Sequence, residues 1–178
     1  MTEIEVKIRI DDFEDIEDKL KKFINAHIFD WEFEDNLIFD FPDLRLKKEG
    51  RLLRLRNSGG KNILTFKTPS KDKDEKFKIR EEFETIVSDF NKMMKIMELL
   101  GLKIFFRYQK YRKTYIIDDN HISLDKTPIG NFIEIEGDKK SIMKIANLFK
   151  KSEKDFITES YYTLFREKYD KGDMVFEK

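Results

Sequence analysis

The chain contains no cysteine, which excludes disulfide bonds, thiolate metal sites and cysteine nucleophiles and is compatible with a reducing compartment. It also has no net charge, because 36 lysines and arginines balance 36 aspartates and glutamates. No overall field therefore favours nucleic-acid or membrane binding, and any charged ligand must be met locally. No apolar run approaches the roughly 18 residues that span a bilayer, and the charged N-terminus is unlike a signal peptide. We expect a cytoplasmic protein without nucleic-acid or membrane partners; a homodimer stays open.

Histidine is scarce, and the chain lacks repeats and low-complexity linkers. His27 and His121 lie far apart, and neither accompanies a serine or cysteine pattern for nucleophilic catalysis, so we do not expect a catalytic histidine. The chain does have 178 residues, of which 40% are charged and 39% hydrophobic. That apolar share is enough to build a core, and the length suits one domain over residues 1–178.

Alternating charged and apolar residues predict β-strands. Glu3, Glu5, Lys7 and Arg9 share one face of the first strand, and isoleucines and a valine share the other. The doublet Gly59-Gly60 predicts a hairpin turn after Ser58. The expected strands are residues 3–10, 28–41, 52–56, 62–68, 76–87, 103–117, 121–124 and 132–136.

Apolar residues at helical spacing predict four helices between and after these strands. Asp11 or Asp12 would cap a first helix that ends near Ala26, and Ser88 or Asp89 would cap a second that ends at Gly101. Two more are expected at residues 141–149 and 159–168. The first helix has the apolar stripe Phe13, Ile16, Leu20, Phe23 and Ile24. Together the elements predict an α+β fold in which helices cover the apolar strand faces.

Charged faces recur from strand to strand. One interpretation is a set of solvated outer faces with cross-strand pairs that contribute roughly 0.2–1 kcal/mol each. However, helices would cover the apolar faces, so that the charged faces would meet inside a sheet that curls shut. Unpaired buried ions cost several kcal/mol, which favours a hydrated tunnel with a function. Arginine and lysine suit polyphosphate oxygens, and paired carboxylates suit Mg²⁺ or Mn²⁺.

Short motifs in order along the chain resemble the CYTH superfamily, which includes class IV adenylyl cyclases, thiamine triphosphatases and inorganic tripolyphosphatases. The first is the ExExK signature at Glu3 to Lys7. The others are DNLIFDFPDLRL followed by LLRLR (35–56), LTFKTP (64–69), KIREEFE (78–84), KYRKTY (110–115), ISLDKTPIGNFIEIEG (122–137) and ESYYTLF (159–165). The resemblance implies a closed eight-stranded antiparallel β-barrel, the triphosphate tunnel, with helices packed outside.

The resemblance also implies roles for individual residues. The implied metal ligands are Glu3, Glu5, Glu134 and Glu136, with Asp125 nearby. The implied triphosphate-binding and catalytic residues, which would stabilise charge on the leaving group, are Lys7, Arg54, Arg56, Lys67, Arg80, Lys110 and Arg112. Arg9 and Glu82 are further expected tunnel residues. Arg107, Tyr108 and Tyr111 fit either the tunnel or the surface.

Several functions stay open. The KYRKTY strand and the TPIGNFIEIEG segment favour a class IV adenylyl cyclase type, which converts ATP to cyclic AMP and pyrophosphate. The NLIFDFPDLRL segment also resembles inorganic tripolyphosphatases, so hydrolysis of tripolyphosphate, thiamine triphosphate or a nucleoside triphosphate is the alternative. A non-catalytic module that binds polyphosphate or nucleotides, and a structural domain with solvated charged faces, are hypotheses of other classes.

Overall fold

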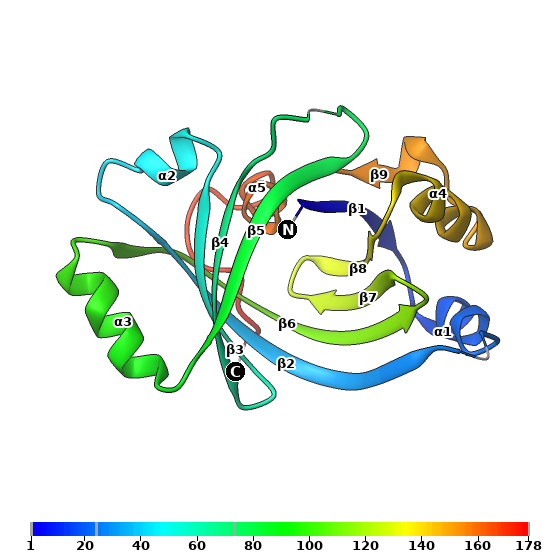
Figure 1. The fold of residues 1–178 in the computed structure, drawn as a ribbon, viewed down its shortest axis with the longest axis horizontal. Coiled ribbons are helices and arrows are strands. Elements are labelled where there is room, and N and C mark those ends of the chain that lie inside the picture. Colours follow the sequence, from blue (N-terminus) through cyan, green and yellow to red (C-terminus); the bar gives the residue numbers. More distant parts are fainter. Residues whose placement is uncertain (1, 24, 73, 178) are drawn as a thin grey trace.

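A closed β-barrel dominates the computed structural model, which describes residues 2–23, 25–72 and 74–177 (Figure 1). In this part of the chain, eight strands pair antiparallel in the order β5, β4, β3, β2, β6, β7, β8, β1, and pairing of β1 with β5 closes the ring. The predicted eight-stranded antiparallel barrel is confirmed. The strands are β1 (Thr2–Ile10), β2 (His27–Asp40), β3 (Leu52–Ser58), β4 (Lys61–Pro69), β5 (Lys78–Val87), β6 (Lys103–Ile117), β7 (Asn120–Thr127) and β8 (Gly130–Glu136).

Strand β1 joins three neighbours. Its first half pairs with β5, its second half pairs with β8, and the short β9 (Phe156–Ile157) pairs with Lys7 and Ile8. The sequence did not predict β9, because two residues carry no measurable period. Strand β7 is also longer than expected and includes Asp125. The predicted turn after Ser58 is confirmed: Gly59 and Gly60 have φ values of 54° and 78°, which favour glycine.

In the described part of the chain, five helices pack outside the barrel. They are α1 (Glu14–Leu20), α2 (Arg45–Lys48), α3 (Phe90–Leu99), α4 (Lys139–Leu148) and α5 (Tyr161–Arg166). The Asp89 carboxylate accepts a hydrogen bond from the Lys92 backbone at 2.9 Å and caps α3 as predicted. The sequence missed α2 and a 3₁₀ turn at Glu153–Asp155, since one turn shows no amphipathic repeat. Among the described helices, none has the length and apolar character needed to cross a membrane.

Helix α1 is shorter than predicted. Phe13 occupies its N-cap position, and the last helical residue is Leu20 rather than Ala26. The chain has to turn before His27, because His27 already pairs with Ile116 of β6. Ile16 and Leu20 of the expected apolar stripe are buried. Ile24 lies outside the described residues.

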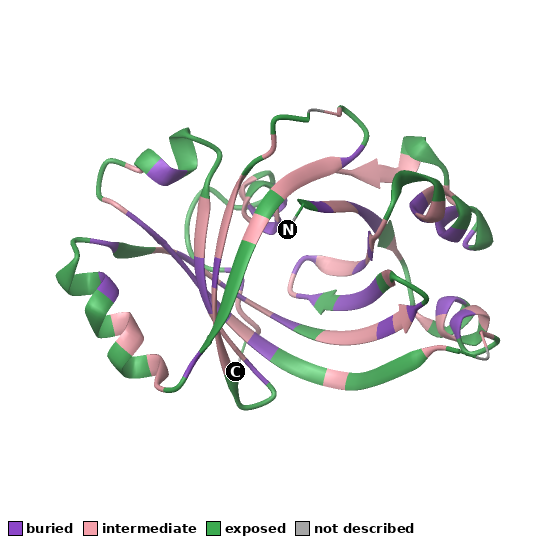
Figure 2. Ribbon diagram, in the orientation of Figure 1, coloured by how far each residue is buried: buried purple, intermediate pink, exposed green. Residues whose placement is uncertain are grey.

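The hydrophobic core lies between the helices and the outer wall of the barrel (Figure 2). Val6 and Ile8 of β1 point outward and pack in one cluster with α1 and α4, and Met97 of α3 packs in another with Leu55 of β3. Each fully buried side chain of this kind contributes about 1.5–3 kcal/mol. Because the apolar faces are covered from outside, the opposite strand faces are free to carry charge inside the barrel.

Helix α5 and the segment after it pack at one end of the barrel. Leu164 and Phe165 belong to a buried cluster with Phe106, Phe132 and Met174. The Met174 backbone accepts a hydrogen bond from Gln109 at 2.8 Å and donates one to Arg107 at 3.0 Å, so the C-terminal segment is attached to β6. This buried cluster closes one end of the barrel with apolar side chains, and we call it the apolar floor.

Candidate functional site

The barrel encloses a cavity of about 840 Å³, a size typical of small-molecule sites. All eight barrel strands, together with the α2 segment and α5, contribute side chains to its wall. The charged lining residues are Glu3, Glu5, Lys7, Glu34, Asp40, Lys47, Arg51, Arg54, Arg56, Lys67, Lys78, Arg80, Glu82, Glu84, Lys110, Arg112, Glu134 and Glu136. The alternation seen in the sequence thus places charge on the inner face.

Arg9 is the exception on β1. It shares the face of Glu3, Glu5 and Lys7, yet it is exposed and does not line the cavity. Its Nη1 donates to the Ile129 carbonyl at 3.0 Å, and its guanidinium lies 4.6 Å from the centre of the Phe132 ring. The predicted tunnel role of Arg9 is therefore corrected, because the apolar floor separates it from the cavity.

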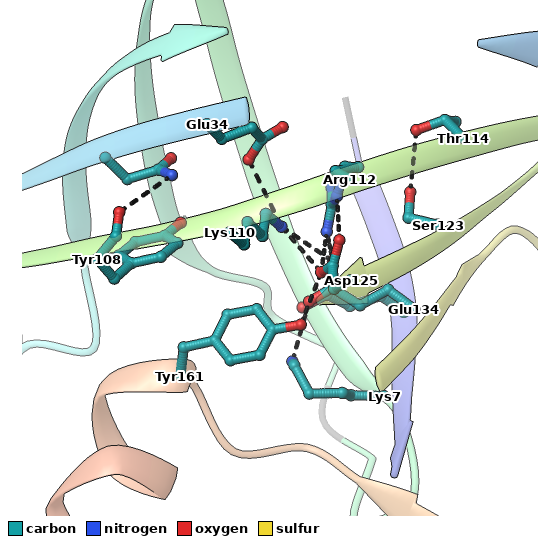
Figure 3. A network of polar contacts seen from close by, with 12 residues as sticks. Lys7, Glu34, Tyr108, Lys110, Arg112, Thr114, Ser123, Asp125, Glu134 and Tyr161 are labelled. Carbon is teal, nitrogen blue, oxygen red and sulfur yellow. Dashed lines mark hydrogen bonds and ion pairs between the residues drawn. The ribbon is translucent and has the colours of Figure 1, made fainter. Parts of the chain in front are cut away.

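A buried network of ion pairs forms part of the cavity wall (Figure 3). Asp125 lies at its centre and is fully buried. Its carboxylate accepts hydrogen bonds from Lys110 Nζ at 2.9 Å, from Arg112 Nε and Nη2 at 2.6 Å each, and from the Tyr161 hydroxyl at 2.6 Å. Asp125 does not line the cavity. Its oxygens accept hydrogen bonds from Lys110, Arg112 and Tyr161, and a metal-ligand role for Asp125 stays a prediction.

Glu134 lies beside this network and joins it to β1. Its carboxylate is 3.1 Å from Lys7 Nζ and contacts Arg112 Nη2. Burial alone would raise the pKa of Glu134, but Arg112, Lys110 and Lys7 together hold that pKa well below its ordinary value. Glu134 therefore stays ionised, with its charge shared among three cations.

Glu34 is a cavity residue that the sequence reasoning missed. Its carboxylate lies 3.3 Å from Arg56 Nη1 and 3.6 Å from Lys110 Nζ. Burial opposes its ionisation, but Lys110, Arg112 and Arg56 lower the pKa of Glu34 to about 2. The signal was present as Glu32, Glu34 and Asn36 alternating along an aromatic-rich strand, and the direct pairing of Glu34 with Lys110 in the β2–β6 register explains the contact.

Two arginines on β3 face the cavity with unused donors. Arg54 donates to Tyr108 Oη at 3.3 Å and to Thr65 Oγ1 at 3.1 Å. In the described chain, the buried Nε atoms of Arg54 and Arg56 have no hydrogen-bond partner. Burial, followed by repulsion from Arg54, lowers the pKa of Arg56. An anion in the cavity beside the two guanidinium groups would reduce this repulsion.

Carboxylates gather where β1 meets β5 and β8. Glu5 pairs directly with Glu136 in the β1–β8 register, and Glu3 precedes Glu5 on the same face. Lys67 Nζ lies 2.6 Å from Glu3 and 3.0 Å from Glu82. Burial and then the charge of Glu5 raise the pKa of Glu3 to about 7, and burial also raises the pKa of Glu136. Lys78, by contrast, lowers the pKa of Glu5, so that the carboxylates of this group differ in how readily they ionise.

The structure places most predicted site residues in one cavity. Lys7, Arg54, Arg56, Lys67 and Arg80 line it, together with Lys110, Arg112 and the four predicted glutamates. Lys78 is a further lining cation, and its Nζ lies 2.5 Å from Glu5. Among the residues left open, Tyr108 lines the cavity, Arg107 pairs with Asp35 and Tyr111 is exposed.

The glutamates where β1 meets β5 and β8 meet only part of what a hard divalent cation requires. Within residues 2–23, 25–72 and 74–177, no three His, Asp or Glu side chains are grouped closely enough to hold a metal ion. Mg²⁺, however, needs only one or two protein carboxylates when phosphates and waters complete its shell. Glu3, Glu5 and Glu136 offer that donor chemistry on neighbouring positions of β1 and β8.

Comparison with known proteins places this architecture in a family. A protein of Methanocaldococcus jannaschii, described as a candidate adenylate cyclase, is 31% identical over 167 residues, which cover 93% of this chain and 89% of the relative. A candidate adenylate cyclase of Vibrio parahaemolyticus superposes with a TM-score of 0.81 at 22% identity, over 93% of this chain and 98% of the other. A Hippeastrum protein, described as a candidate adenylyl cyclase with a dominant triphosphatase activity, superposes with a TM-score of 0.67 at 18% identity, over 93% and 95%.

The low identities of the two superposed structures establish the fold alone. The family follows from the sequence relative and from the CYTH domain model, which matches residues 1–161. The chain belongs to the CYTH domain family.

Proposed function

We propose that this protein is a metal-dependent enzyme that acts on a substrate with a triphosphate group inside the barrel. The observation that carries the proposal is the pair of arginines on β3, Arg54 and Arg56, whose side chains line the cavity. They lie in the same cavity as Lys7, Lys110 and Arg112. A linear polyphosphate is an anion that several cations of one cavity can bind at once.

The metal in this proposal is Mg²⁺ or Mn²⁺, held by Glu3, Glu5 and Glu136 with Glu134 close by. Hard oxygen ligands suit both ions. A bound ion would neutralise phosphate charge and bridge phosphate oxygens to the protein. Binding there would also offset the burial and the neighbouring charge of Glu5, which together raise the pKa of Glu3.

The chain's own residues would do most of the work of orientation. Arg54 and Arg56 would bind phosphate oxygens from β3, and Lys67 and Arg80 would bind them from β4 and β5. Lys7, Lys110 and Arg112 would stabilise the negative charge that develops on the leaving group. Because these cations are already held by Asp125, Glu134 and Glu34, little reorganisation is needed when charge builds up.

The reaction depends on which nucleophile is aligned. With the 3′-hydroxyl of ATP near the α-phosphorus, the products are cyclic AMP and pyrophosphate, and we propose this class IV adenylyl cyclase activity first. The M. jannaschii relative, described as a candidate adenylate cyclase, supports it. With water near the terminal phosphorus, the protein would be a triphosphatase. The triphosphatase activity described for the Hippeastrum protein makes that the second candidate.

Product analysis tests the proposal. Purified protein is incubated with ATP, tripolyphosphate or thiamine triphosphate in Mg²⁺ or Mn²⁺, and cyclic AMP, pyrophosphate and orthophosphate are measured. Cyclic AMP with pyrophosphate supports the cyclase, whereas rapid orthophosphate release without cyclic AMP supports the triphosphatase.

The same assay tests the alternative hypothesis of a binding module without catalytic activity. If the protein binds triphosphate but turns over none of these substrates with either metal, the enzyme hypothesis fails. Turnover that is unchanged in Glu134→Ala and Glu136→Ala variants would contradict the metal-dependent step. The variants should be compared at a temperature well below their measured unfolding midpoints.

A further inference from the structure

Tyr161 lies next to two cations of the cavity, Lys7 and Lys110, and the proposed function assigns it no role. It is the first residue of α5 and is 6% exposed. Its ring centre lies 4.5 Å from Lys7 Nζ and 5.3 Å from Lys110 Nζ, within the range of a cation–π contact (Figure 3). The ring of Tyr161 thus lies close to two ammonium groups, one from β1 and one from β6.

The hydroxyl of Tyr161 reaches the same cations by a second route. It donates to Asp125 at 2.6 Å, and the other donors to that carboxylate are Lys110 and Arg112. The chain just before α5 adds a further contact, because the Glu159 carbonyl accepts a hydrogen bond from Lys7 Nζ at 3.4 Å. Lys7, Lys110 and Arg112 are therefore all fixed, directly or through Asp125, by the start of α5.

We propose that Tyr161 is a positioning residue that holds Lys7 and Lys110 with its ring and Arg112 through Asp125, so that α5 pre-organises the phosphate-binding cations. Lysine has a long, flexible side chain, and a ligand that must first immobilise it binds more weakly. A preformed arrangement avoids that cost. This role rests on the proposed function only where triphosphate binding is concerned; the positioning of the ammonium groups stands on the contacts alone.

Three variants separate positioning from packing. Tyr161→Phe keeps the ring and removes the hydroxyl, whereas Tyr161→Leu removes both. Phe165→Leu is the matched control, because Phe165 is buried in the same cluster on the same helix and packs on Phe106 and Tyr169. Loss of general helix packing would affect both leucine variants alike.

The first measurement needs no ligand. An aromatic ring shifts the NMR resonances of protons above its face, so lysine labelled with ¹³C reports the contact. We expect upfield-shifted ε-methylene protons for Lys7 and Lys110, assigned with Lys7→Arg and Lys110→Arg. These shifts should persist in Tyr161→Phe and Phe165→Leu and vanish in Tyr161→Leu. Unshifted resonances in the wild-type protein would overturn the proposal, even if Tyr161→Leu does not fold.

The second measurement is the affinity for tripolyphosphate, determined by calorimetric titration with Mg²⁺. Loss of the ring contacts should weaken binding about ten-fold in Tyr161→Leu. Tyr161→Phe should recover most of that loss, and Phe165→Leu should bind like the wild type. Equal weakening in both leucine variants, or none in Tyr161→Leu, would overturn the proposal. Absence of binding to the wild type would instead contradict the proposed function, leaving the NMR result to decide the positioning.

Discussion

At the scale of single residues, the cavity is stabilised by opposite charges that hold one another before any ligand binds. Glu134 pairs with Lys7 and Arg112, and Glu34 pairs with Arg56. Such pairing offsets much of the cost of burying ions, which otherwise reaches several kcal/mol per charge. Ligand binding would then exchange partners within an existing network, and removal of one partner should be costly.

Glu34 gives a prediction that depends on pH. Glu34→Gln removes a buried carboxylate charge that Lys110 and Arg56 share, which should reduce the free energy of unfolding by roughly 3 kcal/mol at pH 7. The pKa of Glu34 is about 2 in the folded protein and near 4.5 when unperturbed. Its contribution is therefore complete above about pH 4.5 and is lost as the pH falls toward 2.

The measurement is denaturant unfolding of wild type and variant at pH 7 and at pH 3. The difference in unfolding free energy between them should shrink at the lower pH. Glu49→Gln is the control, since Glu49 forms an exposed pair with Arg51, and this variant should unfold like the wild type at both values. A Glu34→Gln deficit that stays constant with pH would show that the lost carboxylate charge is not the cause.

Arg56 gives a prediction about binding. Arg56→Gln removes a charged donor that an anion would use, and charge-assisted hydrogen bonds of this kind correspond to about 10- to 100-fold in affinity. The loss should appear in the dissociation constant for tripolyphosphate. Arg107→Gln is the matched control, because Arg107 pairs with Asp35 outside the cavity and should not affect binding. Equal affinities for all three proteins would contradict the site.

Sequence reasoning at this scale worked where a residue's face decides its place. The two-residue period of β1 placed Glu3, Glu5 and Lys7 on one face, and this face lines the cavity. It does not report depth along the barrel: Arg9 shares that face but lies outside the cavity lining, and Asp125 is covered by its own partners. Alternation gives the face of a side chain but not its position along the barrel axis.

At the scale of elements, the short α2 shapes the cavity wall near α5. Asp40 ends β2, is 3% exposed and accepts hydrogen bonds from the backbones of Leu46 and Lys47 at 3.0 and 2.9 Å. Lys47 in turn donates to Tyr162 Oη at 3.1 Å. The Asp40 carboxylate therefore holds α2 in place, and α2 contacts α5 through the Lys47–Tyr162 hydrogen bond.

Asp40→Ala tests this connection. Loss of a carboxylate that satisfies two backbone donors should lower the free energy of unfolding by about 1–3 kcal/mol. Asp43→Ala provides the control, because Asp43 is an exposed neighbour that pairs with Arg45 at the surface, and it should leave the unfolding midpoint unchanged. Urea denaturation of both variants decides the point. If the two variants proved equally stable, Asp40 would not be holding α2.

Element prediction succeeded for long periodic segments and failed for short ones. The bounds of β6 at residues 103–117 and the Asp89 cap of α3 agree with the sequence interpretation. In contrast, α2 depends on the buried Asp40 carboxylate. Strand β9 depends on the point beyond Glu5 at which β5 no longer pairs with β1, because β9 pairs with Lys7 and Ile8 there. Contacts between residues distant in the chain decide these elements, and local periodicity does not report them.

At the scale of the whole molecule, the fold separates two kinds of interior. Apolar side chains pack between the helices and the outer wall of the barrel, whereas charged side chains line its interior. A ligand in the cavity would contact both the β1–β8 wall, through Lys7, and the β3–β6 wall, through Arg54 and Lys110. Occupancy should therefore stabilise the closed barrel as a unit, because the bound state is lost when the ring opens.

Thermal unfolding with and without tripolyphosphate tests the central claim that the barrel interior is a triphosphate site. At a ligand concentration about 100-fold above the dissociation constant, the stabilisation is about 2.7 kcal/mol, which corresponds to a Tm increase of roughly 5–10 °C. We expect this increase with Mg²⁺ in the wild type, a much smaller one in Arg54→Gln/Arg56→Gln, and little effect of orthophosphate. An unchanged Tm of the wild type at millimolar tripolyphosphate would contradict the account.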